Sequence, residues 1–334
     1  MKTGIKEISL ETGFSPATVS NALRRKKGVK EETVKIIHES AKRLGYYTEK
    51  KKLSLRFVTF RKNGKIIDDS LIFPAMIEGV EKQAKRLGYE TVFSRLDYEE
   101  ESFNKRLKEV LTDTSSLVIL LGTEMQEEDY QLFKNYQGYM IVLDGWSETS
   151  SYDGVLINNT DAMYKVVDYL LQKGHRQIGY LRGDYRIKGF IYREYGFYRK
   201  LRECGIEVKK EHIVTVGTRI ESAYEKMKEY LKDYRDMPTA FVAENDVIAL
   251  GAMRALQEYG YRIPQDISIV GFDDIRFGAI SSPALTTVKV FKQEMGETAV
   301  RRALNHITYG EDFVKMKIQV ATKFIERDSV CSIE

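Results

Sequence analysis

Short apolar runs alternate with amphipathic helical stretches from residue 56 onward, and this alternation limits the possible folds more than any other feature of the sequence. Runs with strand character include Phe57–Phe60, Leu117–Leu121 and Ile178–Leu181. A helical spacing of three, four and three residues separates Ile77, Val80, Ala84 and Leu87. Continuous apolar strands separated by such helices predict parallel sheets that are covered by helices on both faces.

The length of this alternating region indicates more than one sheet. Most of the 334 residues take part in it, which is more than a single core normally uses. We therefore expect an α/β body of two lobes, each built on a parallel sheet, with a cleft between them. In open parallel sheets, ligands bind outside the carboxyl ends of the strands.

Three predicted strands end in polar sequences. Asp144 and Trp146 follow one strand, Asn245 and Asp246 follow another, and Asp273 follows a third. Aspartate and asparagine are also ordinary cap and turn residues, and capping is an equal alternative for Asn245. Three polar ends together predict a site for a polar ligand. Trp146, the single tryptophan, either stacks on a sugar ring or fills the core.

Composition excludes several classes of protein. Two cysteines are too few for a disulfide scaffold or a cysteine metal cluster, and they are typical of a reducing cytoplasm. The apolar runs reach five residues, which is too short to span a bilayer. Glu7 and Glu11 interrupt the N-terminus, so no signal peptide is expected. These features predict a cytoplasmic protein without a membrane partner.

The net charge of +4 is distributed unevenly. Residues 1–52 hold ten lysines and three arginines against six glutamates, a charge of +7, whereas the rest of the chain carries −3. A small basic head on a slightly acidic body indicates a nucleic-acid-binding domain joined to a separate partner domain. A solvated basic tail explains the charge equally well.

The apolar pattern of residues 5–47 decides between these two interpretations. A first short helix ends at Gly13, and Ser15 caps a second helix that begins at Pro16, where the missing N–H is not needed. The expected core positions are Ile5 and Ile8 in the first helix, Val19 and Leu23 in the second, and Val34, Ile37, Ala41 and Leu44 in a third. This pattern predicts a helix-turn-helix domain.

The motif of this head resembles the DNA-binding domain of the lactose-repressor family. The match covers Ile5–Leu23, Gly28–Thr33 and Leu44–Tyr46. It implies that Pro16, Ala17 and Asn21 read base edges in the major groove, and Asn21 is suited to adenine. The alternative for Asn21 is an exposed polar residue with no partner.

The same resemblance implies contacts to phosphates. Ser15, Thr18 and Ser20 supply small hydroxyls at the start of the second helix, where helix-end amides also hold phosphates. Arg24 and Arg25 follow this helix and are expected to bind phosphates, with a charged surface loop as the alternative.

The resemblance continues through the body. Matching runs include Gly174–Gly179, Arg193–Phe197 and Ile263–Asp274. It implies a two-lobed sensor like the periplasmic sugar-binding proteins, with three crossings of the chain between the lobes. The residues at family effector positions are Arg193, Asn245 and Asp273, and Asp144 and Phe73 are carried over from less similar surroundings.

The chemistry of these residues suits a polyol. Carboxylates accept hydrogen bonds from hydroxyls, arginine donates them and asparagine does both, so we expect a carbohydrate effector. Apolar ring faces are expected from Phe73, Trp146 or Phe291. A salt bridge to Glu194 or to a neighbouring helix is the alternative role for Arg193.

The predicted organisation has three parts. Residues 1–47 form the head, 48–55 a short basic linker, and 56–334 the effector-binding and dimerisation body. Within the body we expect one lobe from about 56–157 with 290–317, and the other from 158–289 with 318–334. The linker is shorter than the family connector, so we expect Lys50, Lys51 and Lys52 to touch phosphates without kinking the DNA. The alternative is a wedge formed by Leu53 or Leu55 in the minor groove.

Enzymatic function is not expected. The sequence lacks a Gly-x-Gly-x-x-Gly loop, a Gly-x-Ser-x-Gly elbow and a His-Glu-x-x-His motif, and we expect no metal or cofactor. The basic head argues against the interpretation as a sugar transport protein. The sequence therefore predicts a homodimeric repressor that binds a pseudo-palindromic DNA operator and answers to a small molecule. Control by a protein partner, or by a purine, remains the alternative.

Overall fold

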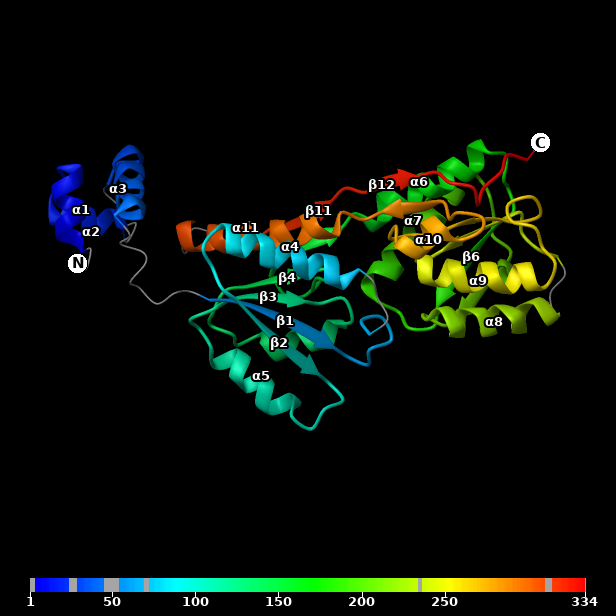
Figure 1. Ribbon diagram of the computed structural model, residues 1–334, viewed down its shortest axis with the longest axis horizontal. Helices are drawn as coiled ribbons and strands as arrows, with labels where there is room; N and C mark the ends of the chain where they lie inside the picture. Colours follow the sequence, from blue (N-terminus) through cyan, green and yellow to red (C-terminus); the bar gives the residue numbers. More distant parts are fainter. Residues whose placement is uncertain are drawn as a thin grey trace. The chain divides into compact units, whose positions relative to one another are not determined.

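The computed structural model describes residues 4–23, 29–44, 54–68, 72–233, 236–309 and 314–333. The chain divides into two compact units, Met1–Ser54 and Leu55–Glu334 (Figure 1). In these described residues, no helix is both long and apolar enough to cross a membrane.

The described residues of the first unit form three helices, which confirms the predicted helix-turn-helix. They are α1 (Ile5–Thr12), α2 (Pro16–Leu23) and α3 (Glu31–Arg43). Gly13 ends α1 in a left-handed conformation with φ of 72°, and its N–H donates to the carbonyl of Ser9. The core consists of Ile8, Val19, Ala22, Ile37 and Ala41. Ala22 is fully buried where we expected Leu23, which is only half-buried at the edge of this core.

The first lobe of the body is built on a six-stranded parallel sheet with the order β11-β5-β4-β3-β1-β2. Its strands are β1 (Leu55–Arg61), β2 (Thr91–Asp97), β3 (Leu117–Leu121), β4 (Met140–Leu143), β5 (Asp153–Ile157) and β11 (Lys317–Val320).

Helices cover both faces of this sheet. On one face lie α4 (Phe73–Arg86) and α11 (Lys292–Tyr309), and on the other lie α5 (Phe103–Thr112) and the 3-10 helix η2 (Glu127–Phe133) (Figure 1). Successive side chains of β1 point to opposite faces of the sheet, so Phe57 packs on the α4 side and Val58 on the α5 side. Both faces are therefore apolar and need a covering helix. Helices α4 and α11 approach closely at Gly296, where a Cβ would lie 2.2 Å from the carbonyl oxygen of Met76.

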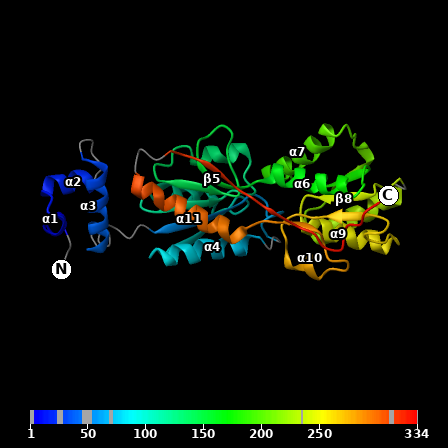
Figure 2. The same ribbon diagram turned by 90° about the horizontal axis from the view of Figure 1, so that it is seen from above.

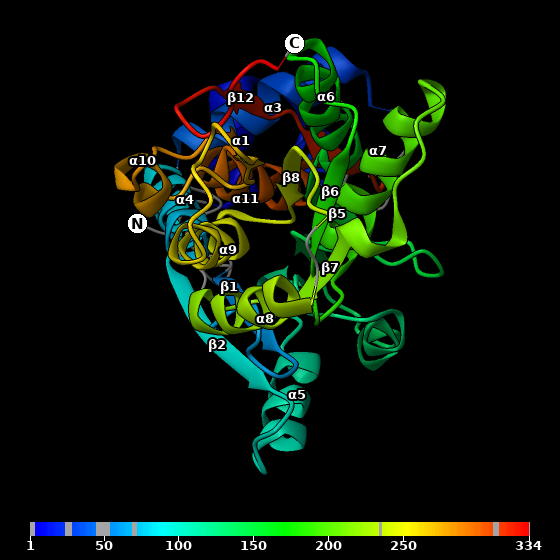
Figure 3. The same cartoon turned by 90° about the vertical axis from the view of Figure 1, so that its right-hand side faces the viewer.

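The second lobe has a parallel sheet with the order β7-β6-β8-β9 and an antiparallel pair, β10 with β12. The strands are β6 (Ile178–Gly183), β7 (Ile213–Val216), β8 (Ala240–Ala243), β9 (Ser268–Val270), β10 (Thr287–Lys289) and β12 (Lys323–Ile325). Two pairs of helices enclose the parallel sheet (Figure 3), namely α6 (Asn159–Gln172) with α7 (Lys188–Glu203), and α8 (Ile220–Asp233) with α9 (Asp246–Glu258). The short helices are η3 (Lys210–His212) and α10 (Arg276–Ile280).

The chain crosses between the lobes three times, as the family resemblance implied. The crossings follow β5, β10 and β11, and the last is visible as an extended segment running from one lobe to the other (Figure 2). We expected the last crossing at about residue 318, but β11 pairs with β5 as far as Val320. The prediction of two parallel α/β lobes is confirmed.

Candidate functional site

A pocket lies between the two lobes at the carboxyl ends of their strands. Its polar lining consists of Thr123, Asp144, Arg193, Thr218, Asn245 and Asp273. Its apolar lining consists of Ile66, Ile72, Phe73, Ile157, Ile187, Phe190, Val247 and Ile275. Five of the seven residues proposed from the sequence therefore meet at one place, and Trp146 and Asp246 are the exceptions.

Arg193 is the cationic group among these lining residues, and its position is fixed on several sides. It is 3% exposed and projects from α7. Its Nε donates to Oδ1 of Asn159 at 2.8 Å, and its Nη1 donates to the backbone carbonyl of Glu244. The guanidinium also lies 3.7 Å from the ring centroid of Phe272. Arg193 is thus held rigidly at the floor of the pocket.

The alternative pairing of Arg193 with Glu194 does not occur. Glu194 forms ion pairs with Arg186 at 2.8 Å and Arg182 at 3.5 Å on another side of α7. Arg193 instead faces Asp273, with 3.5 Å between Nη2 and Oδ1. Both side chains are buried, so the pair is shielded from solvent.

Asp273 is held in an unusual backbone conformation. Its φ is 113°, and its N–H donates to the carbonyl of Val288 at 2.8 Å. Burial raises the pKa of its carboxyl, while the charges of Arg193 and Lys292 oppose this effect. A non-glycine residue in this region is strained, and such strain is typical of ligand sites.

Asp246 does not line the pocket, contrary to its assignment from the sequence as an effector-binding residue. It is fully buried, and its Oδ2 accepts a hydrogen bond from the N–H of Ile275 at 2.9 Å. Its Oδ1 accepts from the hydroxyl of Thr287. Burial, reinforced by the charge of Asp273, raises the pKa of Asp246 to about 8. The side chain joins α9 to the segments that precede α10 and α11.

Asp144 lies across the pocket in the first lobe. It follows β4 with a φ of 55°, and its Oδ2 accepts from the hydroxyl of Thr123 at 2.7 Å. Burial raises its pKa to about 6, and the Thr123 bond and the charge of Arg193 act in the opposite direction. The pocket is thus lined by two carboxyl groups and one guanidinium.

Asn245 has both of the roles that the sequence left open. Its Oδ1 accepts from the N–H of Ile248 at 2.9 Å, which caps α9. The residue also lines the pocket. Within the described part of the chain its Nδ2 has no hydrogen-bond partner, so this donor is available to a ligand.

The aromatic candidates have different positions. Phe73 begins α4 and lines the pocket, whereas Trp146 lines an adjoining pocket that shares Asp144 and Arg193 with the first. Trp146 contacts Tyr192 of α7 edge-on, with ring centroids 4.8 Å apart. Phe291, which we expected as a third ring, is not among the residues that line either pocket, and Phe190 is present instead.

A polar clasp, formed by Glu127 and Lys188, joins the lobes beside Trp146. Lys188 Nζ lies 2.5 Å from Oε2 of Glu127, and it is 5.5 Å from the centroid of the Trp146 ring. Burial alone raises the pKa of Glu127, but hydrogen bonds from Lys188, Ser147 and Thr149 outweigh it and hold this pKa well below its usual range. The clasp therefore stabilises contact between the lobes.

Sequence reasoning missed most of the pocket wall. Phe190 could have been found, because it precedes Arg193 by one helical turn and so lies on the same face of α7. Thr123 and Thr218 carry no periodic signal, since both lie in loops after strands. Ile66 and Ile187 also belong to loop or cap positions, where burial depends on the partner lobe.

The DNA-binding candidates occupy the expected helix of the head. Pro16, Ala17 and Asn21 are exposed on α2, and Ser15 is exposed immediately before it. The Ser15 Oγ accepts from the N–H of Thr18 at 3.1 Å, so Ser15 caps the helix.

Other DNA-binding candidates are only partly described. Thr18 and Ser20 are half-buried on α2. Arg24 and Arg25 lie outside the described residues, as do Lys50–Lys52 and Leu53 of the linker. Leu55 is fully buried at the start of β1, and this burial removes it as a candidate for a minor-groove wedge.

Comparison with known proteins relates the whole chain to bacterial repressors. A family model described as a periplasmic binding protein-like domain matches residues 167–330. An HTH-type transcriptional repressor PurR from Mannheimia succiniciproducens is 28% identical over 332 residues, covering 98% of this chain and 99% of its own length. A PurR repressor from Pectobacterium carotovorum is 29% identical over 330 residues, covering 98% and 96%.

Solved structures agree with this relation at the level of fold. A complex of the transcriptional regulator CelR with cellobiose matches with a TM-score of 0.74 at 20% identity, over 98% of this chain and 99% of that one. The lac repressor dimer bound to operator and the anti-inducer ONPF matches with a TM-score of 0.73 at 22% identity, over 99% and 100%.

Proposed function

We infer that this chain is a transcriptional regulator of the lactose-repressor type, a repressor whose DNA binding is controlled by a small molecule held between its lobes. The resemblance predicted from the head motif is confirmed by repressors that align with 98% of the chain. The observation that carries the inference is a helix-turn-helix head joined to a two-lobed body with a polar pocket at its strand ends.

For the head, we propose that α2 enters the major groove of a pseudo-palindromic operator. Pro16 and Ala17 are exposed at the N-terminal end of this helix, where base edges are read, and Asn21 is exposed one turn further along it. Ser15, Thr18 and Ser20 are proposed to hold phosphates, together with Arg24 and Arg25. The test is selection of bound duplexes from a random pool, which should return two related half-sites.

For the body, we propose a neutral effector rich in hydrogen-bond donors, with an unphosphorylated carbohydrate as the first candidate. Asp144 and Asp273 offer acceptors, whereas three of the donors of Arg193 already bond to protein atoms. An anionic ligand would face two carboxyl groups in a buried site and is disfavoured. Donor groups on a sugar ring fit this lining.

A purine base is the second candidate, favoured by the apolar lining. Phe73, Phe190 and Ile66 present apolar surface suited to a flat ring. Calorimetry with cellobiose, glucose, hypoxanthine and guanine separates the two candidates, because only one class should bind. Glucose 6-phosphate and AMP test the charge argument, since both should bind at least about ten-fold more weakly than their neutral counterparts. Tighter binding of either phosphate would overturn the proposed neutral effector.

We also propose that the protein acts as a homodimer through an apolar face of the body. Leu87 and Phe93 are exposed at the end of α4 and on the edge strand β2, and Phe277 and Ile280 are exposed on α10. Helices α4 and α10 lie on the same side of the body (Figure 2). Large exposed apolar side chains of this kind mark a protein interface. Phe93→Glu should convert the dimer to a monomer in sedimentation experiments.

A further inference from the structure

One carboxylate holds the loop that follows β1. Glu124 lies three residues beyond the end of β3 and is fully buried. Its Oε2 accepts hydrogen bonds from the N–H groups of Lys62, Asn63 and Gly64 at 2.9, 3.2 and 3.0 Å. Its Oε1 accepts from the N–H groups of Ile66 and Ile67 at 2.8 and 2.9 Å. Residues 62–67 are referred to below as the Glu124-held loop.

The shape of this loop depends on both oxygens of Glu124. The five N–H groups point inward to one side chain instead of pairing with a neighbouring strand, so the Glu124 carboxylate supplies the acceptors for these backbone donors. A glutamine would keep the size of the side chain but replace one accepting oxygen with an NH₂ donor. At least two backbone N–H groups would then be left without an acceptor, which is unfavourable in a buried site.

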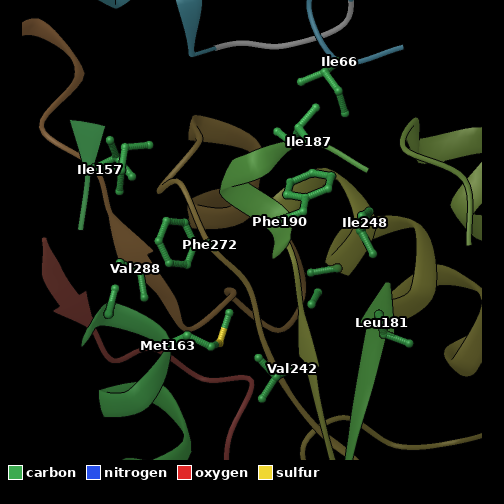
Figure 4. Packing of buried hydrophobic residues seen from close by; sticks show 14 of the residues in the cluster. Ile66, Ile157, Met163, Leu181, Ile187, Phe190, Val242, Ile248, Phe272 and Val288 are labelled. Carbon is green, nitrogen blue, oxygen red and sulfur yellow. The ribbon is translucent and has the colours of Figure 1, made fainter. Parts of the chain in front are cut away.

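The Glu124-held loop also contacts the second lobe. The carbonyl of Lys65 accepts from the hydroxyl of Thr218 at 3.0 Å, and Lys65 Nζ lies 3.4 Å from Oδ2 of Asp184. Ile66 points toward Ile187 and Phe190 of the second lobe (Figure 4), and all three line the pocket.

A second contact to the other lobe comes from Glu124 itself. Its backbone carbonyl accepts from the hydroxyl of Tyr185 at 3.2 Å. The side chain of one residue therefore shapes the loop, while its main chain bonds directly to the opposite lobe. No other role for Glu124 is needed, because its carboxylate does not line the pocket.

We propose that Glu124 is a positioning residue that sets closure of the effector cleft, by holding the loop whose Lys65 and Ile66 contact the second lobe. The inference rests on the proposed function only in treating the pocket as an effector site. Loss of either carboxylate oxygen loosens the loop, and the lobes then separate more readily. Glu124 touches no ligand in this proposal and acts through Lys65 and Ile66.

The full-length protein contains its own probe of closure. Trp146 is the single tryptophan, and it lies in the first lobe against Tyr192 and Lys188 of the second. Opening of the cleft exposes this ring, which acrylamide quenching of its fluorescence measures without DNA or effector. Hydrogen exchange of the backbone amides in residues 62–67 reports separately on the loop. Both measurements can therefore succeed or fail independently of the proposed function.

The variants are Glu124→Gln and, as a matched control, Glu128→Gln, which removes an exposed carboxylate four residues away. In Glu124→Gln, exchange of the loop amides should accelerate by about ten-fold or more, since hydrogen bonds to a charged group are lost. The ratio of molecules with a closed cleft to molecules with an open cleft should fall by about two- to ten-fold, and quenching of Trp146 should rise accordingly. Glu128→Gln should match the parent protein in both measurements.

Thr218→Val provides a second test that leaves the five bonds to Glu124 in place, in case Glu124→Gln does not fold. It should raise quenching of Trp146 while loop exchange stays unchanged. Loop exchange in Glu124→Gln equal to that of Glu128→Gln would overturn the proposal. Unchanged quenching of Trp146 in both Thr218→Val and Glu124→Gln would also overturn it, because neither the loop nor its bond to Thr218 would then affect closure.

Discussion

Replacement of Asp246 by asparagine should stabilise this protein, and increasingly so at higher pH. Asp246 is fully buried, and its pKa in the folded chain is about 8, against 3.8 for an ordinary aspartate. Folding therefore favours the protonated form. The contribution of Asp246 to the free energy of unfolding is complete below pH 3.8 and is lost as the pH rises through 8, because the unfolded chain releases the proton more readily.

The size of the effect follows from this difference in pKa. Between the two pKa values, the wild-type protein loses about 1.4 kcal/mol of unfolding free energy for each pH unit. Asparagine does not ionise and preserves the geometry. Its Oδ1 can accept from the N–H of Ile275, and its Nδ2 can donate to the hydroxyl of Thr287. The variant should thus gain roughly 3 kcal/mol over wild type between pH 5 and pH 7.5.

Urea unfolding followed by circular dichroism at pH 5, 6.5 and 7.5 measures this difference. Asp233→Asn serves as the control. Because Asp233 is exposed, its replacement should change the free energy of unfolding by the same amount at all three pH values. The reasoning is refuted if the curves of wild type and Asp246→Asn against pH run parallel. That result would mean that Asp246 folds in its charged form.

Three further predictions concern the head, the pocket and the clasp. Asn21→Ala should weaken operator binding by about 1–3 kcal/mol and relax the base preference at one position. Fluorescence anisotropy with single-base operator variants measures this, and an equal loss of affinity on every duplex would argue against base reading. Arg193→Met should abolish the response to effector but leave operator affinity in its absence unchanged, as titrations with and without effector would detect. Lys188→Met should weaken closure of the lobes by about 1 kcal/mol and therefore raise acrylamide quenching of Trp146. Quenching equal to that of wild type would show that the clasp does not contribute to closure.

The sequence predicted the fold because the local signals and the final packing agree. The spacing of Ile77, Val80 and Ala84 gives α4 one apolar face, and Val80 and Ala84 are fully buried against the sheet. Leu117–Leu121 is apolar at every position, and all five residues are buried as expected for a central parallel strand. Both patterns are local, so they can be read without knowing the partner elements.

The error at Asp246 has a local geometrical cause. Asn245 and Asp246 are adjacent in sequence, but Asn245 is extended, with φ of −153°, and Asp246 begins α9. Consecutive side chains at such a junction point in different directions. Asn245 therefore faces the pocket while Asp246 faces the interior, and residue type alone does not distinguish them.

The contacts between the lobes could not be predicted. Glu127 with Lys188, and the backbone carbonyl of Glu124 with Tyr185, join segments that are 61 residues apart in sequence and belong to loops or helix ends. Neither pair has a periodic pattern or a recognisable motif. Their roles depend on how two separately folded sheets come together, which no local signal encodes.

The central claim is that a small molecule in the cleft controls sequence-specific binding by the head. Operator affinity of the full-length protein at fixed ionic strength, measured on a selected and a scrambled duplex with and without cellobiose or hypoxanthine, tests it most directly. We predict at least about a thousand-fold preference for the selected duplex, and a change of about 5- to 150-fold in that affinity with one of the two molecules. Equal affinity for the selected and scrambled duplexes, in the presence and absence of both molecules, would contradict the account.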